Sequence, residues 1–376
     1  MKKKVFEFVK QETVLIVACV LALISTFFVT PDEKYFEYID FRTLGILFSL
    51  MALMAGFQSM GVFEEISRKL LNKVQNIRQL VVILTLLCFF FSMIITNDVA
   101  LITFVPFTFV LFDMLGQSTV QKWLIPVVIL QTIAANLGSM LTPIGNPQNL
   151  YLYGKSGMAF DKFICLMLPY AALSLAILLV SSFAIGTIGN KRITVNLTPN
   201  HKEKIFHKII VYIALFFICI LAVLRVLSVG IAFAITICAI VIFDRKVLRK
   251  VDYSLLLTFV GFFIFIGNMG RLPMFSSLLQ KCISGNEVIT AVLTSQIVSN
   301  VPAALLLSNF SNDLSALIIG TNIGGLGTLI ASMASLISYK FIAQKKNIST
   351  GKYVLCFSIA NIILLAILML LYVIMK

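Results

Sequence analysis

Apolar segments and short polar connections alternate along almost the whole chain. Most of the segments are long enough, as helices, to cross a hydrocarbon core about 30 Å thick, and none shows the alternating pattern of a barrel strand. This pattern predicts an all-α polytopic membrane protein. The segments lie at about residues 13–30, 43–63, 80–95, 98–116, 123–153, 163–188, 209–224, 226–243, 253–270, 288–298, 302–318, 318–340 and 353–375.

Two stretches carry a polar interruption in the middle instead of crossing as one span. The first, at about 80–116, is interrupted by the Thr-Asn-Asp tripeptide at 96–98. The second, at about 288–317, is interrupted by the Ser-Asn-Val tripeptide at 299–301. We expect each stretch to be a re-entrant hairpin, the first entering from the cytoplasmic side and the second from outside.

Two further apolar stretches, at 123–153 and 318–340, are interrupted by residues that cannot continue a helix. The first contains Pro, Gly and Asn at 142–149, and the second is rich in Gly and Thr at 320–328. Lipid offers no partner for the backbone groups that such a break frees. A broken helix at membrane depth is tolerated where protein surrounds it or where it lines a wet cavity, so both breaks are expected to lie at a binding site.

The apolar run from 209 to 243 is too long for a single span. Its 35 residues would extend about 52 Å as one helix, well beyond a hydrocarbon core of about 30 Å. Arg225, Ser228 and Gly230 predict a tight outward turn that divides the run into two spans. The chain is therefore expected to have about nine transmembrane helices plus the two re-entrant hairpins.

The basic residues are distributed unevenly over the connections that this arrangement predicts. With a cytoplasmic N-terminus, 22 of the 30 Lys and Arg residues fall on the cytoplasmic side and 8 fall outside. Cytoplasmic loops carry such an excess of positive charge. The prediction is a multi-pass protein of the plasma membrane with its N-terminus in the cytoplasm and its C-terminus outside. Its first apolar run is expected to be a span and not a removed signal peptide.

Composition narrows the class of function. The chain is 60% hydrophobic and 12% charged, and the cytoplasmic loops explain its net charge of +14, so no nucleic-acid partner is expected. Seven scattered cysteines form no CxxC pair, and His201 and His207 do not form an HExxH site. Without a GxSxG or Walker A sequence, neither an enzyme nor an ATP-driven pump is supported. No cofactor is expected besides Na⁺ or H⁺ as a coupling ion.

The two halves of the chain contain the same features in the same order. The breaks align at an offset of 186 residues, which places Asn136 on Asn322. The hairpin tips align at an offset of 203 residues, which places Asn97 on Asn300. Matches that are weak one by one, but occur in the same order, indicate an internal duplication.

The predicted topology gives the two halves opposite orientations in the membrane. Residues 1–190 and 228–376 are therefore expected to form an inverted repeat, joined by a cytoplasmic loop and a linking span at 191–227. Inverted repeats with paired broken helices are typical of secondary transporters, whose substrate and ions bind near the midplane of the membrane.

The tips and the breaks supply the chemistry for anion and cation binding. Helix N-termini offer N–H groups to an anion, freed carbonyls can coordinate Na⁺, and the amide of Asn can do either. The alternative is helix–helix packing, for which small residues and hydroxyls are common in membranes. The predicted ion-coupling residues are Thr96, Asn97, Asp98, Ser139, Gly145, Asn149, Asn300, Asn322 and Gly324. The predicted substrate-binding residues are Asn97, Thr142, Asn146, Ser299, Asn300 and Thr328.

Asp98 is the one acidic residue well inside an apolar segment. An intramembrane carboxylate costs about 2.5–3.5 kcal/mol on insertion scales, so such a group normally has a partner, an ion or a proton. A coupling-ion or proton site is the leading hypothesis. Na⁺ is expected at Asn97, Asp98 and Gly145, and also at Asn300 and Asn322. The alternative is a structural role for Asp98 as the N-cap of the second hairpin arm.

These motifs resemble the citrate-transporter-like domain of the ion transporter superfamily, which divalent-anion:sodium symporters and arsenite permeases share. The similarity covers nearly the whole chain, and its most specific segments are 95–102, 138–149 and 299–302. The tip asparagines match the Ser-Asn-Thr tips of the symporters. Asp98 and Val301 stand where the symporters have threonines that contact substrate, and the Asn-Asp tip looks more like the arsenite permease branch. The resemblance implies a homodimer in which a transport domain moves as an elevator against a scaffold domain.

Sequence and resemblance together predict an ion-coupled secondary transporter of a small anion, such as a di- or tricarboxylate or an inorganic oxyanion, driven by Na⁺. An arsenite or antimonite efflux permease and a Na⁺/H⁺ antiporter are the alternatives within the same fold. An ion channel is the alternative from another class, although channel filters are usually built from repeated identical elements and the two tips here differ. The expected partners are the anionic substrate, the lipid bilayer and a second copy of the chain.

Overall fold

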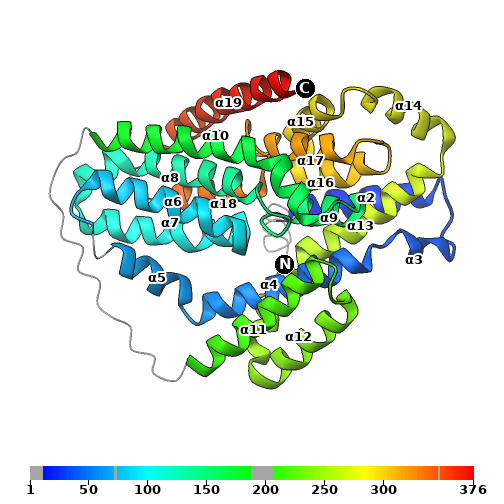
Figure 1. Cartoon of the computed structure of the whole chain (residues 1–376). Helices are drawn as coiled ribbons and strands as arrows, with labels where there is room; N and C mark the ends of the chain where they lie inside the picture. Colours follow the sequence, from blue (N-terminus) through cyan, green and yellow to red (C-terminus); the bar gives the residue numbers. More distant parts are fainter. Residues whose placement is uncertain (1–11, 72–73, 188–205, 346–347) are drawn as a thin grey trace, which may run out of the picture.

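The structure is a computed structural model in which helices are joined by short loops (Figure 1). The described residues contain no strand. Eight of their helices are long and apolar enough to cross a membrane, judged by length and composition. The chain is therefore an all-α polytopic membrane protein, which confirms the prediction from the apolar pattern. The described residues are 12–71, 74–187, 206–345 and 348–376.

Two long helices of the first half, Phe41–Ser59 and Ile77–Ile95, begin at polar capping residues. The carboxylate of Asp40 accepts a hydrogen bond from the backbone N–H of Thr43 at 2.9 Å, and Asn76 accepts one from Gln79 at 2.9 Å. Such caps satisfy N–H groups that have no partner inside the helix. The helices are α2 (Thr13–Thr26), α3 (Lys34–Tyr38), α4 (Phe41–Ser59), α5 (Val62–Leu71), α6 (Ile77–Ile95), α7 (Asn97–Met114), α8 (Gln117–Ser139), α9 (Pro147–Ser156) and α10 (Phe160–Thr187).

The second half has the same kind of helix cap at the equivalent position. Asp252 accepts a hydrogen bond from the N–H of Leu255 at 3.0 Å, as Asp40 does in the first half. The elements are α11 (Phe206–Val223), α12 (Val229–Phe243), a 3₁₀ turn η1 (Arg245–Lys250), α13 (Tyr253–Gly270), α14 (Pro273–Ile283), α15 (Glu287–Val298), α16 (Asn300–Ser308), α17 (Leu314–Ile323), α18 (Met333–Gln344) and α19 (Thr350–Met375).

Both predicted breaks are present, and so is the predicted division of 209–243. The first break separates α8 from α9 and the second separates α17 from α18. In the long run, Arg225 has a positive φ of 64° and Ser228 accepts a hydrogen bond from the N–H of Ile231 at 3.4 Å, so the chain turns between α11 and α12. These three interruptions follow directly from residues that disfavour a continuous helix.

The second hairpin differs from the prediction in length. The sequence suggested one apolar segment at 302–318, but α16 ends at Ser308 and a new helix, α17, begins after Asp313. Asp313 caps α17 by accepting a hydrogen bond from the N–H of Ala316 at 2.9 Å. The arms of the second hairpin are therefore 12 and 9 residues long, whereas those of the first are 19 and 18.

The helices form two groups that meet along one side. We call α2, α4, α11, α12 and α13 the α4 bundle, and α6 to α9 with α15 to α18 the hairpin bundle. In Figure 1, α6, α7, α8 and α18 lie alongside one another at the left, with α4, α11 and α12 below them. The two bundles touch where α9 and α16 pack against α4 and α13. The ring of Tyr151 on α9 lies 5.6 Å from that of Phe263 on α13.

The basic N-terminal residues at 2–4 and most of the predicted cytoplasmic loop at 189–208 lie outside the described residues. The predicted orientation in the membrane and the predicted division into inverted repeats stay predictions.

Candidate functional site

Each hairpin turns at a single residue with an unusual backbone. Thr96, between α6 and α7, has φ 75° and ψ 151°, and Ser299, between α15 and α16, has φ 76° and ψ 157°. Only one other described non-glycine residue, Arg225, has a positive φ. A positive φ is costly for residues with a side chain, and such strain is concentrated at functional sites. The two tips therefore share a backbone geometry that their sequences do not make easy.

Each tip is held by the break of its own half. The N–H of Asn97 donates to the carbonyl of Gly145 at 3.2 Å, and the N–H of Asn300 donates to the carbonyl of Ala331 at 3.0 Å. Asn97 and Asn300 differ by 203 in number, and Gly145 and Ala331 differ by 186, which are the two offsets found in the sequence. The same contact thus occurs once in each half.

A second pair of contacts joins each break to the first arm of its hairpin. The hydroxyl of Thr142 donates to the carbonyl of Met93 at 2.5 Å. The hydroxyl of Thr328 lies 3.5 Å from the carbonyl of Gln296, the one acceptor that it has among the described residues. These pairs obey the same two offsets, so the breaks and the hairpin arms are arranged alike in the two halves.

The two broken helices meet at a buried polar seam, which we define as Asn136, Asn149, Asn322 and Ser335 with the groups bonded to them. The amide of Asn136 donates to Ser335 at 3.2 Å, and the amide of Asn322 donates to Asn149 at 2.6 Å. The offset of 186 relates these two bonds to one another. Asn136 also accepts from Ser332 at 3.0 Å. The seam therefore connects the halves through side chains at their breaks.

Asn136 also joins the seam to the first tip. Its side-chain oxygen accepts a hydrogen bond from the amide of Asn97 at 3.1 Å, and its backbone carbonyl accepts one from Ser139 at 2.9 Å. Ser139 in turn accepts from the amide of Asn146 at 2.7 Å. All four of these side chains are buried. The network thus runs from the hairpin tip through the end of α8 to the start of α9.

Gly145 is required by the close packing of the first break. A Cβ at this position would lie 2.1 Å from the carbonyl oxygen of Ser139, a distance that no side chain tolerates. The lack of a side chain also leaves the Gly145 carbonyl free to receive Asn97. Gly324 is less constrained, because its Cβ would lie 2.7 Å from the hydroxyl of Ser295.

Three buried oxygens around the tips and breaks have no hydrogen-bond partner among the described residues: Asp98 Oδ1, Asn146 Oδ1 and Asn322 Oδ1. The amides of Asn146 and Asn322 are both engaged as donors, so only their acceptor sides are free. Buried polar atoms are almost always satisfied in folded proteins. Each of the three belongs to a tip or a break, and one is a carboxylate, so each is a group that a bound cation would satisfy.

The carbonyls freed by each break are satisfied by an amide side chain. In the first break, the amide of Asn149 lies within 3.2–3.4 Å of the carbonyls of Ser139, Met140 and Thr142. In the second break, the amide of Gln296 donates to the carbonyls of two break residues, Gly324 and Leu326, at 3.0 Å and 2.9 Å. The first amide comes from the helix after the break and the second comes from the hairpin arm.

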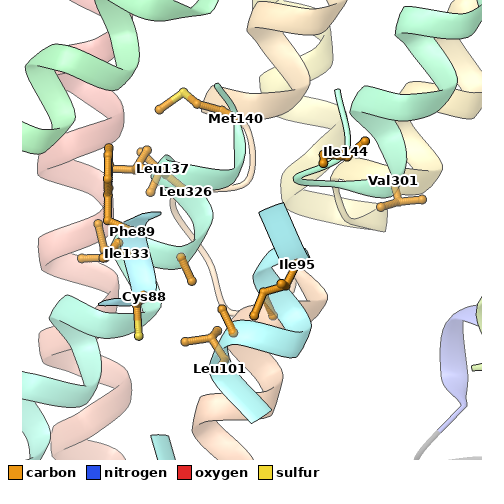
Figure 2. Close-up of a cluster of buried hydrophobic side chains, with 14 of the residues drawn as sticks. Cys88, Phe89, Ile95, Leu101, Ile133, Leu137, Met140, Ile144, Val301 and Leu326 are labelled. Atoms are coloured by element: carbon orange, nitrogen blue, oxygen red, sulfur yellow. The ribbon is translucent and has the colours of Figure 1, made fainter. Parts of the chain in front are cut away.

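Apolar side chains surround this polar region (Figure 2). Figure 2 shows Ile144 of the first break beside Val301 of the second hairpin, with Ile95 on the first hairpin arm below them. Phe89 and Ile133 pack α6 against α8 to one side. Electrostatic interactions are stronger where apolar groups exclude water, so ions held at the tips would be bound more tightly than at a wet surface.

The structure brings most of the predicted site residues together. Asn97 and Asp98 begin α7, and Ser299 and Asn300 form the second tip. Residues at the two breaks, including Ser139, Gly145, Asn146, Asn149, Asn322 and Gly324, lie in or beside the hydrogen-bonded network. Their binding roles stay predictions.

The structure also bears on the predicted substrate-binding role of Thr328 and on the alternative capping role of Asp98. Thr328 is exposed, and its N–H and hydroxyl both lie against Gln296, so the structure places it on the outer wall of its break. The alternative role for Asp98 as an N-cap is wrong, because Thr96 occupies that position and Asp98 lies inside the first turn of α7.

Four polar residues of this region were missed by the sequence prediction: Asn136, Gln296, Ser332 and Ser335. The signal for Asn136 was present, because the internal repeat aligns it with Asn322, which was selected. Ser332 and Ser335 follow the second break as Asn146 and Asn149 follow the first, at the same offset of 186. Applying the offset to every selected residue would have found three of the four.

The described residues contain no group of three or more His, Cys, Asp or Glu side chains that could hold a metal ion. The oxygens at the tips and breaks are amide, hydroxyl and carbonyl oxygens with one carboxylate, Asp98. Unwound carbonyls and helix ends of this kind bind alkali cations in transporters. The donor set thus fits Na⁺ better than a transition metal.

Comparison with known proteins gives results that agree with this geometry. The family model described as citrate transporter matches residues 5–314. An uncharacterized transporter of Methanocaldococcus jannaschii is 34% identical over 340 residues, which are 90% of this chain and 91% of that protein. The inner membrane protein YbiR of Escherichia coli is 32% identical over 317 residues, 82% of each chain. A silicon efflux transporter of Oryza sativa is 28% identical over 147 residues, 39% of this chain and 29% of that protein.

Proposed function

The chain belongs to the citrate transporter family and is a membrane transporter, and from this premise we propose that it carries a small anion coupled to Na⁺ by alternating access. Na⁺ binds beside the first hairpin tip, and the anion binds between the two tips. The observation that carries the proposal is the set of unpartnered buried oxygens at Asp98, Asn146 and Asn322.

The cation site is supported by charge as well as by geometry. No described basic side chain forms an ion pair with Asp98. A buried carboxylate without a partner is costly, and a bound cation removes that cost. The carbonyl of Gly145 already accepts from Asn97 and has a second lone pair that points away from that bond. Asp98, with amide and carbonyl oxygens, therefore provides a site for one Na⁺ at the first tip, and Asn300 with Asn322 provides a second.

The anion site is supported by the ends of four helices. α7, α9, α16 and α18 all begin at a tip or just after a break, and none of the four has a side-chain cap. The N-termini of α4 and α13, which lie elsewhere, are capped by Asp40 and Asp252, although α2, α8, α14 and α15 also begin without a side-chain cap. The first N–H groups of α7 and α16 already donate to Gly145 and Ala331, so what these helix ends offer an anion is their partial positive charge. Four of them around one region favour a negatively charged substrate.

Binding of the two ions is expected to be coupled. A cation beside Asp98 neutralises the carboxylate that would otherwise repel an anion at the neighbouring tip. The same free energy must appear in both directions, so the anion raises the affinity for Na⁺ by the factor by which Na⁺ raises the affinity for the anion. This reciprocity is the thermodynamic basis of symport in the proposal.

The two bundles provide parts for an elevator movement in the plasma membrane. The hairpin bundle contains both tips and both breaks, and the α4 bundle touches it mainly through α9 and α16. A homodimer built on the α4 bundle would hold that bundle still while the hairpin bundle moves. Chemical cross-linking between α9 and α4, at Gly154 and Thr43 replaced by cysteine, tests this movement. A Cβ at Gly154 would lie 3.7 Å from the Thr43 hydroxyl, so a cross-link can form there and should arrest transport.

A second candidate is efflux of a weakly acidic oxyanion or oxyacid, in exchange for a cation. Asp98 favours this alternative, since the carboxylate stands at a tip where the second half has the neutral Val301. A fixed negative charge disfavours a doubly charged substrate unless Na⁺ is bound. The partial similarity to a silicon efflux transporter is consistent with this candidate.

Uptake into proteoliposomes tests the proposal. The full-length protein should take up succinate, citrate, sulfate, phosphate or arsenite in a saturable way, and only with an inward Na⁺ gradient. Asp98→Asn should lose the Na⁺ dependence, whereas Asp161→Asn, which changes an exposed acid in the first turn of α10, should keep it. Uptake that is indifferent to Na⁺ in the wild type would contradict the symport mechanism.

A further inference from the structure

A pocket with a volume of about 310 Å³ lies where the α4 bundle meets the hairpin bundle. It is formed by the start of α4, the end of α9, the second half of α13 and the residue that ends α16. Two cations line it, Arg42 in the first turn of α4 and Lys155 in the last turn of α9. Pockets of this volume hold small molecules, and paired cations select negatively charged ones.

Neither cation forms an ion pair with an acidic side chain in the described part of the chain. The ion pairs there involve other residues, and Lys155 bonds only to neutral groups: Tyr151 at 3.3 Å, Ser308 at 3.1 Å and the side chain of Asn309. Asp40 is the one acid in the lining. Its two oxygens accept from the N–H and the hydroxyl of Thr43, and its negative charge also acts on Lys155, so the two cations and one acid leave the lining with one net positive charge.

The pocket is connected to the polar seam by two helices. α9 begins after Asn146 and reaches the pocket with Tyr151 and Lys155, and α16 begins at Asn300 and ends beside Asn309. At 1.5 Å per residue, the pocket begins about 8 Å along α9 from Asn146 and about 14 Å along α16 from Asn300. The helices whose N-termini face the proposed anion site therefore have their other ends at this pocket.

We propose that this pocket is an anion-binding site that captures small carboxylates or oxyanions on their way to the space between the hairpin tips. The inference rests on the proposed function, because it makes the pocket the entry site for the same substrate. The pocket lies at the contact between the two bundles, so an anion released from it is already next to the helices that lead to the tips. On the predicted topology this is the external entry.

The two cations should contribute unequally. Arg42 lies at the N-terminus of α4, where the helix dipole adds positive charge, whereas Lys155 lies at the C-terminus of α9, where the dipole subtracts it. Lys155 also has neutral hydrogen-bond partners already, whereas the Arg42 side chain has none among the described residues. Arg42 is therefore the stronger anion-binding group of the two.

The test is uptake by the full-length protein in proteoliposomes, with succinate, citrate and inorganic phosphate as separate probes. Arg42→Gln should raise KM about three- to tenfold and leave kcat within about twofold, because a charge that steers substrate acts before the translocation step. Lys155→Gln should raise KM less, and Arg42→Lys should restore most of the affinity. Lys281→Gln, which removes an exposed lysine on α14, is the matched control and should change nothing. The carboxylate and phosphate arms show which anion the pocket prefers.

The outcomes separate this inference from the proposed function. Saturable wild-type uptake combined with an unchanged KM in Arg42→Gln overturns the proposed role of the pocket and leaves the proposed function standing. An equal loss in kcat for Arg42→Gln and Arg42→Lys also overturns it, because that result indicates a structural role. No saturable uptake of any probe contradicts the proposed function, and the pocket inference falls with it. If Arg42→Gln does not fold, the ionic-strength dependence of the wild-type KM decides, and a KM that salt does not raise overturns the inference.

Discussion

The two tips of the molecule share a backbone and differ in their side chains. Thr96 and Ser299 adopt nearly the same φ and ψ, and each following asparagine donates its N–H to the break of its own half. Only the first tip then places a carboxylate, Asp98, where the second has Val301. The shared backbone places helix ends at both tips, and in the proposed function the carboxylate of Asp98 makes the first tip a cation site.

The breaks differ in the same way. In the first half, Asn149 satisfies the freed carbonyls from the helix that follows, while in the second half Gln296 does so from the hairpin arm. The position equivalent to Gln296 in the first half is Met93, which uses only its backbone carbonyl. A break in a membrane helix thus needs an amide side chain nearby, but its position along the chain is free to vary.

The largest loss of stability is expected from a substitution at Gly145, whose counterpart in the second half is Ala331. Gly145→Ala should cost about 3 kcal/mol or more, because its Cβ would lie 2.1 Å from the Ser139 carbonyl. Ala331→Gly should cost about 1 kcal/mol, through the added freedom of the unfolded chain. The midpoint of thermal unfolding in detergent measures both. Equal midpoints for the two variants would show that the halves do not differ here.

The next largest loss of stability is expected from substitutions in the buried polar seam. Asn136→Ala leaves Asn97, Ser332 and Ser335 without a partner, at a combined cost of about 2–4 kcal/mol. Asn322→Ala removes one bond to the other half, to Asn149, and should cost about half as much. The same unfolding measurement compares them, and a milder Asn136 variant would contradict the central place given to this residue.

A smaller effect is expected where the second break is supported. Gln296→Met makes this position like Met93 of the first half and leaves the carbonyls of Gly324 and Leu326 without their donor. The expected cost is about 1–2 kcal/mol, since water partly replaces the lost bonds at this half-buried site. Hydrogen exchange at the amides of 324–328 should rise, whereas exchange at 142–149 should stay as in the wild type.

The smallest loss of stability is expected from removing the contact that Arg225 makes between the two bundles. Arg225 donates to the carbonyls of Gly157 and Tyr153 at the end of α9, at 2.8 Å and 2.9 Å. Because the arginine is exposed, Arg225→Gln should lower the stability by about 1 kcal/mol or less. A shift in the unfolding midpoint larger than that of Gln296→Met would mean that the contact between the bundles is stronger than its exposure indicates.

Much of this arrangement could be predicted from the sequence, because the membrane restricts the choices. A Pro-Gly-Asn cluster in an apolar run forces a break, so the division into α8 and α9 was predictable. The end of α16 at Ser308 was missed, although four of the five residues before α17 are polar: Asn309, Ser311, Asn312 and Asp313. Asn136 was overlooked because its role depends on a neighbour about 200 residues away, Ser335, which no local pattern shows.

The central claim is that the first tip is the cation site, and the Na⁺ dependence of thermal unfolding tests it most directly. Na⁺ is titrated against choline at constant ionic strength in the wild type, in Asp98→Asn and in Val301→Asn, each as purified full-length protein. A ligand that binds only the folded state raises the unfolding midpoint as its concentration rises. The account predicts a rise in the wild type and in Val301→Asn, and a loss of most of that rise in Asp98→Asn. An Asp98→Asn protein that responds to Na⁺ as the wild type does would contradict the account.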